Sequence, residues 1–508
     1  MRKYMLTQDQ ALTQKCTKYF IIFCFVHILF WTVVPYVTLG ALPFDTAESI
    51  AWGNQWMLGY NKHPPLAAWV TTIAFNLGGD FGVYLLAQLA IIICFIAIWR
   101  LSLRYFSAPL ALLSVVLLEG NLSFTLVSPN FNPTAIMVPL WALMFLTFYH
   151  ALKSQKISTW LWLGFLAGLN VLAKYQVVIL FVPMLFIMLY TTEGRISFRK
   201  LGMYLGLLLS VIVVAPHFIY SYTQSFPEIH YAMGSTFDRD SFMNHFLKPL
   251  NMTINQLGTI AGILVIGLPL MLAKTRAKIE LASFDRTYLF VMALGPFVAT
   301  ILLSAISGSN LGNNWFVPYF SMLGMVVIYL SRPVLTRKNV RAVCILLCIA
   351  FFGLLIGRFG AVAFQPYFTQ SPNSKAYFPG KSIAMKATDI WHQHYHDRLS
   401  YVSGDHYITA FVNIDSPDHP VPLMGWKESE SPWINMKEMR RRGAMFVWYA
   451  KNKYDVMFSH VDADRMPEKI KKEFPRAEYL GVYDFKIAVP FGNYSPIRIG
   501  MAILPPEK

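Results

Sequence analysis

The sequence has little charge, few cysteines and no common nucleotide-binding motif. Only 14% of its 508 residues are charged and 55% are hydrophobic, which argues against an ordinary soluble protein of several domains. The five cysteines are too few and too scattered for a disulfide framework, and they match no zinc-binding spacing. The P-loop, the dinucleotide-binding glycine pattern and the HExxH motif are absent, so a soluble fold that uses ATP or a nucleotide sugar gets no support. Any activated donor is therefore expected to arrive through the membrane.

Long apolar segments recur along the first 360 residues. Each is close to the roughly 20 residues that cross a bilayer, so the sequence predicts a polytopic α-helical membrane protein with about eleven spans. The shorter apolar run at 66–77 follows two prolines and is expected to be an interfacial or re-entrant helix. The predicted spans are 19–39, 82–99, 107–127, 134–150, 159–173, 176–191, 201–220, 254–273, 287–306, 315–331 and 342–360.

Positive charge is divided unevenly between the two sets of loops that these spans define. The N-terminus and one set of loops hold nearly all the lysines and arginines before residue 360. The opposite loops hold only Lys62, Lys174, Arg239 and Lys248. By the positive-inside rule the cation-rich side is cytoplasmic, so the N-terminus lies inside and the chain after about residue 360 lies outside. The first apolar segment is read as a retained signal anchor. The formal net charge of +16 therefore indicates topology and not a nucleic-acid partner.

After residue 361 the composition becomes polar and mixed in charge, with no run long enough to span a bilayer. Short β-rich pieces alternate there with helix-like pieces. The sequence therefore predicts a transmembrane domain over residues 1–360 and an exported α/β domain over residues 361–508. The strand-like pieces are 399–402, 445–449 and 485–489, and the helix-like pieces are 381–394 and 467–474.

Two carboxylates stand together in the first loop of the predicted outer face. Asp45 and Glu48 are three residues apart and share one face of a short helix, which Trp52 and Trp56 would seat at the membrane surface. A carboxylate at the mouth of a membrane cavity can take the proton of an acceptor hydroxyl, so both are candidate catalytic residues. The alternative is structural, because Asp before a helical run with Glu three positions on is also an N-capping pattern.

Two cationic positions follow on the same face. Lys62 and His63 end the first loop, and the prolines after them fix the backbone. A cation at the level of the lipid headgroups suits a phosphate or pyrophosphate leaving group, although a lysine there can also reach lipid phosphates. Lys174 joins two apolar runs that are otherwise continuous, with Tyr175 beside it, so its charge must find an anion or water close to lipid.

Other polar residues of the outer face are candidates for the lining of a substrate cavity. Asn130 and Asn132 lie in a proline-flanked turn between two spans, and Asn314 and Trp315 begin a later span. Glu119 lies inside an apolar run, where an ionisable residue suggests function, the alternative being a local hydrogen bond to a nearby asparagine.

Histidines in two regions are weaker signals. The outer loop of residues 221–253 carries His230 and His245 and is expected to be a mobile substrate loop, or only a solvated connection. His392, His394 and His396 stand at alternate positions without a complementary ligand pattern, so no metal site is predicted.

Several of these motifs together resemble the integral-membrane GT-C glycosyltransferases, specifically the bacterial branch similar to protein O-mannosyltransferases and to ArnT-type aminoarabinose transferases of lipid A. Members have an acidic pair in the first periplasmic loop, then a tyrosine-rich stretch and His-Pro-Pro-Leu, which here are Asp45 and residues 60–66. The family's Thr-Pro-Asp turn resembles residues 128–130, its Gly-Leu-x-x-Leu-x-Lys-Tyr resembles residues 168–175, and its late Asn-Trp resembles residues 314–315. The resemblance covers nearly the whole membrane part and only loosely the C-terminal domain.

The resemblance implies inverting transfer of a sugar from a polyprenyl-phosphate carrier, such as undecaprenyl phosphate, at the periplasmic face of the inner membrane. By position, Asp45 orients or deprotonates the acceptor, while Lys62, His63, Lys174 and Tyr175 contact the donor phosphate. No cofactor is expected beyond the lipid-linked donor, with a divalent ion left open. The expected partners are the bilayer, this donor and a glycolipid or glycan acceptor, with no nucleic acid.

Two positions depart from the family pattern. Thr46 stands where the family has Glu, which leaves Glu48 as the nearest substitute, and Asn130 replaces the acid of the Thr-Pro-Asp turn. An acceptor phosphate, as on lipid A, is already anionic and needs less help from a base than a Ser or Thr hydroxyl. The departures therefore favour a lipid or glycan acceptor over a protein.

Three alternatives stay open at this level: a protein O-glycosyltransferase, a transporter or flippase of the lipid-linked sugar, and an inactive scaffold. The many spans and Glu119 suit a transporter, but the repeated halves and broken midplane helices of many transporters are not evident. Thr46 and Asn130 are the reason to consider a scaffold.

Overall fold

The computed structural model describes residues 2–236, 241–369, 377–450, 465–487 and 496–507. Its contacts divide the chain into two compact units, and each contains pieces from distant parts of the sequence. The first unit comprises residues 1–34, 62–66 and 84–356, and the second comprises residues 35–61, 67–83 and 357–508. The predicted domain limit at residue 360 lies inside helix α14, which runs from Arg337 to Thr369.

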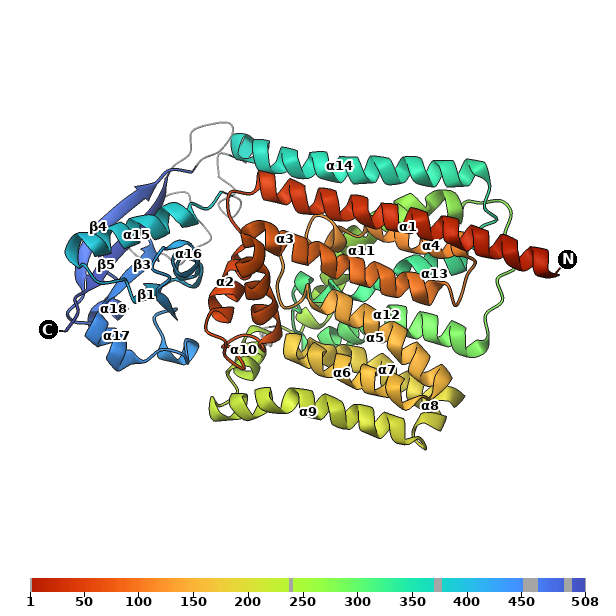
Figure 1. The fold of residues 1–508 in the computed structure, drawn as a ribbon, viewed down its shortest axis with the longest axis horizontal. Coiled ribbons are helices and arrows are strands. Elements are labelled where there is room, and N and C mark those ends of the chain that lie inside the picture. Colours follow the sequence, from red (N-terminus) through yellow and green to blue (C-terminus); the bar gives the residue numbers. More distant parts are fainter. Residues whose placement is uncertain (1, 237–240, 370–376, 451–464, 488–495, 508) are drawn as a thin grey trace. The chain divides into compact units, whose positions relative to one another are not determined.

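The first unit is helical throughout its described residues, apart from connections (Figure 1). Two of its α-helices, α8 (Thr192–Ser197) and α10 (Pro227–Thr236), are short connecting pieces. The others that lie wholly or partly in this unit are α1 (Arg2–Thr38), α3 (Leu66–Ser102), α4 (Ala108–Val116), α5 (Met137–Ser154), α6 (Ile157–Ala173), α7 (Val178–Tyr190), α9 (Leu201–Thr223), α11 (Asn244–Met271), α12 (Ser283–Ser307), α13 (Leu323–Ser331) and α14.

Six described helices are long and apolar enough to cross a membrane, namely α1, α3, α9, α11, α12 and α14. Shorter apolar helices occupy residues 108–120, 157–173, 175–190 and 319–331. The chain is therefore a helical multi-pass membrane protein, as predicted, whereas the number of eleven spans stays a prediction.

Helix α3 consists of two segments that meet at a kink. Gly78 (φ −152°, ψ 16°) and Gly79 (φ 56°, ψ −146°) both leave the helical region. Gly79 adopts a conformation that is accessible essentially only to glycine. The predicted separation of residues 66–77 from the span at 82–99 is thus present as a break in the helix, while its position at the membrane interface stays a prediction.

Two predicted spans are only partly α-helical. The run at 107–127 leaves the α-helix after Val116 and continues through the 3₁₀ turns η1 (Leu117–Gly120) and η2 (Leu122–Phe124). The run at 315–331 begins with η4 (Asn313–Phe316) and η5 (Tyr319–Met322) before α13. Most of these side chains are buried in protein, which is where irregular backbone can be tolerated at membrane depth.

Glycines bring α6 and α9 into close contact. A Cβ atom added to Gly164 would lie 1.9 Å from the carbonyl oxygen of Gly206, and one added to Gly206 would lie 2.4 Å from the carbonyl oxygen of Trp160. Backbones that approach this closely require small residues at the crossing, as in many pairs of membrane helices.

The segment 221–253, predicted to be a mobile substrate loop or a solvated connection, is helical over most of its described residues, while its mobility stays a prediction. Helix α9 continues to Thr223, α10 occupies Pro227–Thr236 and α11 begins at Asn244. The His245 imidazole Nδ1 lies 2.8 Å from the carbonyl oxygen of Ala305. The charged residues of this segment at 238–240 lie outside the described residues.

The second unit contains a five-stranded mixed sheet with strand order β2-β1-β3-β5-β4, so a C-terminal α/β domain is present as predicted. The strands β1 (Tyr401–Gly404), β2 (Val421–Met424) and β3 (Ala444–Tyr449) are parallel, and β5 (Ile497–Leu504) pairs antiparallel with β3 and with β4 (Glu478–Phe485). Of the predicted strand at 485–489, Phe485 is the last residue of β4, residues 486 and 487 are not in a strand, and the other two lie outside the described residues.

Helices cover both faces of this sheet. Met439 of α17 (Met436–Arg442) and Ile470 of α18 (Glu468–Glu473) form a buried cluster with Phe446 and Trp448 of β3. Helix α16 (His406–Asp415) packs against β1 and β2, and α15 (Gly380–His394) packs beside α16. All six residues of β3 are buried, so this strand is the centre of the domain core.

Candidate functional site

The first-loop carboxylates lie on helix α2 (Phe44–Gly53) of the second unit. Pro43 is the N-cap, and no side chain caps the helix, so the alternative that Asp45 is the N-cap is wrong. Asp45 lies in the first turn and is partly exposed, while Glu48 is buried. An acidic residue in the first turn of a helix interacts favourably with the helix dipole.

Glu48 is held by a histidine of the C-terminal domain, which lies in the same unit. One Glu48 carboxylate oxygen is 3.0 Å from Nδ1 of His406, and Nε2 of His406 is 2.8 Å from a carboxylate oxygen of Glu430. The Nζ of Lys427 donates to the other oxygen of Glu430 at 2.7 Å. Burial opposes ionisation of Glu430, but these hydrogen bonds outweigh it and lower its pKa to about 2.

Sequence reasoning missed His406, because no motif marks it. A signal was nevertheless present, since His406 lies shortly after the strand predicted at 399–402 and two residues after the end of β1. Ligands in such domains are held at the carboxyl ends of parallel strands.

Lys174 lies in the first unit at the break that the sequence predicted. Its backbone is extended (φ −168°, ψ 137°) between α6 and η3 (Tyr175–Val177). Its Nζ donates to Oγ1 of Thr134 at 3.0 Å and lies 5.3 Å from the centre of the Trp315 ring. The structure therefore brings together Lys174 and Trp315, two residues that the sequence singled out separately.

Polar contacts position the residues that follow Lys174. The Tyr175 hydroxyl lies 2.7 Å from Nε2 of His217 on α9, and its ring stacks on Phe218. Gln176 donates from Nε2 to the hydroxyl of Tyr319 at 3.2 Å and also to the carbonyl oxygen of Trp315. These contacts fix the orientation of the segment around Lys174.

The asparagines of the proline-flanked turn are connected to Lys174 through Thr134. Oδ1 of Asn132 accepts hydrogen bonds from the backbone N–H groups of Thr134 and Ala135 at 2.9 and 3.1 Å. Asn132 thus positions Thr134, the hydrogen-bond partner of Lys174. Asn130 and Asn132 also line a cavity of about 20 Å³, which has room for about one water molecule.

Lys62 and His63 share an aromatic partner within the first unit. The Lys62 Nζ lies 6.0 Å from the centre of the Tyr231 ring, and the His63 ring centre lies 6.2 Å from it. Tyr231 belongs to α10, in the segment for which the sequence predicts a mobile substrate loop or a solvated connection. Both side chains are half-buried.

Glu119 of η1 is fully buried against helix α1. One of its oxygens accepts from Nε1 of Trp31 at 2.8 Å, and the other lies 2.8 Å from Nδ1 of His27. These contacts replace the expected local hydrogen bond to Asn121, whose Oδ1 accepts from the N–H of Ser123. A role for Glu119 in a substrate cavity stays a prediction, as does that of Asn314, whose side chain lies outside the described part.

An apolar groove of about 640 Å³ lies between α6, η3, α7 and α9. Tyr175 lines it, and this residue immediately follows Lys174. The groove thus brings an apolar surface next to the extended segment that carries the lysine. Its other lining residues include Val171, Val178, Val211, Val214, Phe218 and Ile219.

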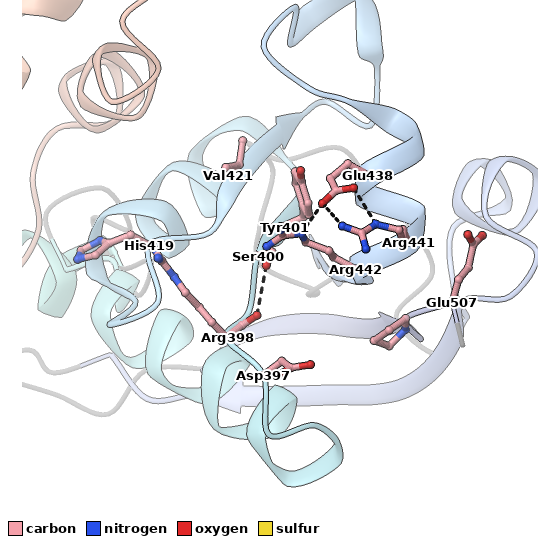
Figure 2. Close-up of a pocket in the computed structure, with 11 residues that line it drawn as sticks. Asp397, Arg398, Ser400, Tyr401, His419, Val421, Glu438, Arg441, Arg442 and Glu507 are labelled. Atoms are coloured by element: carbon pink, nitrogen blue, oxygen red, sulfur yellow. Dashed lines mark hydrogen bonds and ion pairs between the residues drawn. The ribbon is translucent and has the colours of Figure 1, made fainter.

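A polar groove of about 840 Å³ opens where β1 and β2 begin (Figure 2). Figure 2 shows Glu438 of α17 hydrogen-bonded to both Arg441 and Arg442, and these bonds lower the pKa of Glu438 to about 2. Glu438 therefore balances part of the positive charge in the groove. The remaining lining residues are Asp397, Arg398, Ser400, Tyr401, His419, Val421, Pro506 and Glu507.

Among the described residues, no three His, Cys, Asp or Glu side chains are grouped so that they could hold a metal ion. His392 lies 2.9 Å from a carboxylate oxygen of Asp418, and His394 lies 2.9 Å from the carbonyl oxygen of Ile390. The five cysteines are free thiols.

Comparison with known proteins gives one consistent result. The family model described as dolichyl-phosphate-mannose-protein mannosyltransferase matches residues 62–220. The lipopolysaccharide core galacturonosyltransferase RgtB of Rhizobium johnstonii is 21% identical over 433 residues, which are 81% of this chain and 83% of that protein.

Solved structures agree on the fold. ArnT from Cupriavidus metallidurans bound to undecaprenyl phosphate matches with a TM-score of 0.62 and 13% identity, over 95% of this chain and 98% of that one. The apo state of the same protein matches with a TM-score of 0.51 and 13% identity, over 96% and 98% of the two chains. The resemblance to GT-C glycosyltransferases is thus confirmed, in sequence as well as in fold.

Proposed function

We propose that this GT-C-like membrane protein is an inverting glycosyltransferase that moves a sugar from a polyprenyl-phosphate donor to lipid A or another envelope glycolipid or glycan. The reaction takes place at the periplasmic face of the inner membrane. Asp45 is the carboxylate that orients or deprotonates the acceptor. Lys174 and Tyr175, together with Lys62 and His63, receive the donor phosphate.

The single observation that carries this proposal is the setting of Lys174. A lysine that is fixed by Thr134 and Trp315 stands next to an apolar groove of about 640 Å³ between membrane helices. A prenyl chain needs an apolar groove and its phosphate needs a cation at the end of that groove. Undecaprenyl phosphate, which is bound in the ArnT structure, has this combination of groups.

The first loop offers few carboxylates that could act as a general base, and this favours an acceptor that is already anionic. Thr46 replaces a family carboxylate, and Glu48 is engaged by His406, which leaves Asp45 as the partly exposed carboxylate of α2. An anionic acceptor group needs little deprotonation. RgtB is named for transfer to the lipopolysaccharide core, which supports a glycolipid acceptor for this chain as well.

Protein O-glycosylation is the second candidate, because the matching family model describes protein mannosyltransferases. It differs from the first proposal only in the acceptor. The two functions are therefore separated by asking which class of molecule gains the sugar.

The test is mass spectrometry of lipid A and other envelope glycans from a strain without the gene, complemented with the wild type or with Asp45→Asn. The proposal predicts that one sugar-sized mass is lost and that only the wild type restores it. Both proteins must be equally abundant in the membrane. A glycolipid profile that does not change would contradict the glycolipid acceptor, and loss of a sugar from periplasmic proteins would favour the second candidate.

A further inference from the structure

Histidine 406 occupies the edge of the C-terminal sheet at which α/β domains usually hold ligands. It is the first residue of α16 and follows β1 directly, after the N-cap residue Asp405, whose carboxylate accepts from the N–H of Tyr407 at 3.1 Å. Strand β2, on one side of β1, is followed by the turn that leads to Glu430. The chain continues to β3 on the other side of β1, so the strand order reverses here.

The turn after β2 is shaped to let Glu430 approach the imidazole. Gly425 has a positive φ of +63°, and a Cβ atom added to it would lie 2.5 Å from a Glu430 carboxylate oxygen and 3.0 Å from Nε2 of His406. Only glycine fits both the backbone conformation and the close approach. The contact between His406 and Glu430 is therefore built into the local backbone.

At this edge of the sheet, helix α2 of the same chain contacts α16. The Phe44 ring stacks on Tyr407 with centroids 4.5 Å apart, and at the other end of α2 the amide of Asn54 donates to Oδ1 of Asn413 at 2.9 Å. Between these two contacts, Glu48 reaches His406. Both ends of α2 and its middle are thus tied to α16.

The two hydrogen bonds of His406 limit what Glu48 can do. Glu430 is ionised and also accepts from Lys427, so Nε2 of His406 must carry a proton to donate to it. At Nδ1 a proton then lies either on the imidazole, which donates to ionised Glu48, or on Glu48, which donates to the imidazole. In both states Glu48 shares a proton with His406 and is not a free general base.

We propose that His406 is a positioning residue that acts through Glu48 and holds α2 in the orientation in which Asp45 meets the acceptor. Asp45 and Glu48 are one turn apart on the same helix, so a rotation that freed Glu48 would also move Asp45. The inference rests on the proposed function of Asp45. It assigns to the C-terminal domain the task of orienting the first-loop helix.

The hydrogen bonds of His406 to Glu48 and Glu430 make activity dependent on the proton that Glu48 and His406 share. Among the described residues, the charged groups at this edge include Glu48 on α2, Glu430 and Lys427 after β2, Asp405 before α16, and Lys469, whose Nζ donates to the carbonyl oxygen of Gly425 at 3.2 Å. Loss of the shared proton leaves Glu48 and Glu430 both ionised beside a neutral imidazole that has one N–H. One of the two bonds is then lost, and we expect activity to fall on the alkaline side.

The decisive variant is Glu430→Gln, because Glu430 contacts neither α2 nor the substrate site that we propose. Removal of this carboxylate makes the imidazolium less favourable, so the alkaline limb of kcat against pH should move to lower pH by about one unit. His406→Gln should lower kcat by about tenfold to a hundredfold, with less than a twofold change in the KM for the lipid-linked donor. The assay is sugar transfer by the full-length protein in proteoliposomes.

Glu438→Gln is the matched control, because Glu438 is a carboxylate with two cationic partners on the same domain, at the end of the sheet where β1 and β2 begin. It should leave the pH profile unchanged. The proposal is overturned if Glu430→Gln and Glu438→Gln have the same pH profile, or if His406→Gln keeps wild-type kcat. If His406→Gln fails to fold, the dependence of kcat on pH in Glu430→Gln decides whether the proposal holds. Absence of transfer by the wild type would instead contradict the proposed function itself.

Discussion

In the function proposed above, recognition of the lipid-linked donor depends most on Lys174. We expect Lys174→Met to raise the KM for the lipid-linked donor by about tenfold to a hundredfold, because a charge-assisted contact to phosphate is lost while the length of the side chain is kept. Steady-state transfer at varied donor concentration measures this. The control is Lys156→Met, since Lys156 is exposed and flanks the other end of α6. Equal KM values for both variants would contradict the assignment.

Asp415 of α16 gives a pH prediction for the C-terminal domain. Burial, and then the nearby charge of Asp80, raise the pKa of Asp415 from 3.8 to about 6. A raised pKa means that this group favours the folded state most below pH 3.8, and that this contribution is lost as the pH rises through about 6.

Asparagine mimics the protonated side chain, so Asp415→Asn should raise the thermal stability of the purified protein at pH 8 and leave it unchanged near pH 4. Tryptophan fluorescence during heating reports the transition. Asp397→Asn, which changes an exposed aspartate of the same domain, is the control and should have little effect. A stabilisation that is equal at both pH values would refute this account.

At the residue scale, the sequence predicted the candidates whose polarity contrasts with their surroundings. Lys174 was found because it interrupts an apolar run, and Asp45 was found because it lies in a polar loop between such runs. His406 was not found from the sequence, because its partner Glu48 is 358 positions away. Hydrogen bonds over such distances are set by tertiary packing and leave no local pattern.

At the scale of elements, the contact between α6 and α9 is the most sensitive to a single methyl group. We expect Gly164→Ala to lower the free energy of unfolding by about 1–3 kcal/mol, because the new Cβ atom would lie 1.9 Å from the Gly206 carbonyl oxygen and the helices would have to separate. Thermal unfolding in detergent, with transfer activity as a second readout, measures the effect.

Gly258→Ala in α11 is the control for this substitution. A Cβ atom added at Gly258 meets nothing within 4 Å, and alanine favours a helix more than glycine does. Its stability should equal or slightly exceed that of the wild type. If both variants unfold at the same temperature, close packing of α6 on α9 does not contribute to stability in the way described.

The sequence predicted where the apolar segments lie better than it predicted whether their backbone is α-helical or 3₁₀. Runs of hydrophobic residues located the helices, but the 3₁₀ turns η1, η2, η4 and η5 were not predicted. Helix α10 was missed because its segment is polar and lacks a clear apolar period. Turns such as η1 are set by burial against other helices, for example through the contacts of Glu119 with α1, and this information is not local.

At the scale of the whole molecule, the distribution of lysine and arginine predicts the orientation in the membrane. We expect a periplasmic reporter to be active when it is fused after residue 508 and inactive when it is fused after Arg332. Alkaline phosphatase and green fluorescent protein fusions at both sites give complementary readings. The reverse pattern would contradict the topology, and with it the assignment of Asp45 and Lys174 to the outer face.

Composition and loop charge predicted a membrane protein with a separate α/β domain, and the motifs predicted a GT-C resemblance. They did not predict that residues 35–61 and 67–83 form one unit with the C-terminal domain. This association depends on buried contacts such as Phe44 with Phe411, which join segments that no sequence pattern connects.

The most direct test of the central claim is sugar transfer by the purified protein in proteoliposomes that contain lipid-linked sugars and envelope glycolipids from the source cells. Mass spectrometry of both lipid classes follows the sugar. The account predicts that the polyprenyl-phosphate carrier loses a sugar and that a glycolipid gains the same mass. With Asp45→Asn, this transfer should fall by about a hundredfold, because the acceptor is no longer held in the reactive orientation. A sugar that stays on its carrier in the presence of the wild type, or transfer that Asp45→Asn leaves intact, would contradict it.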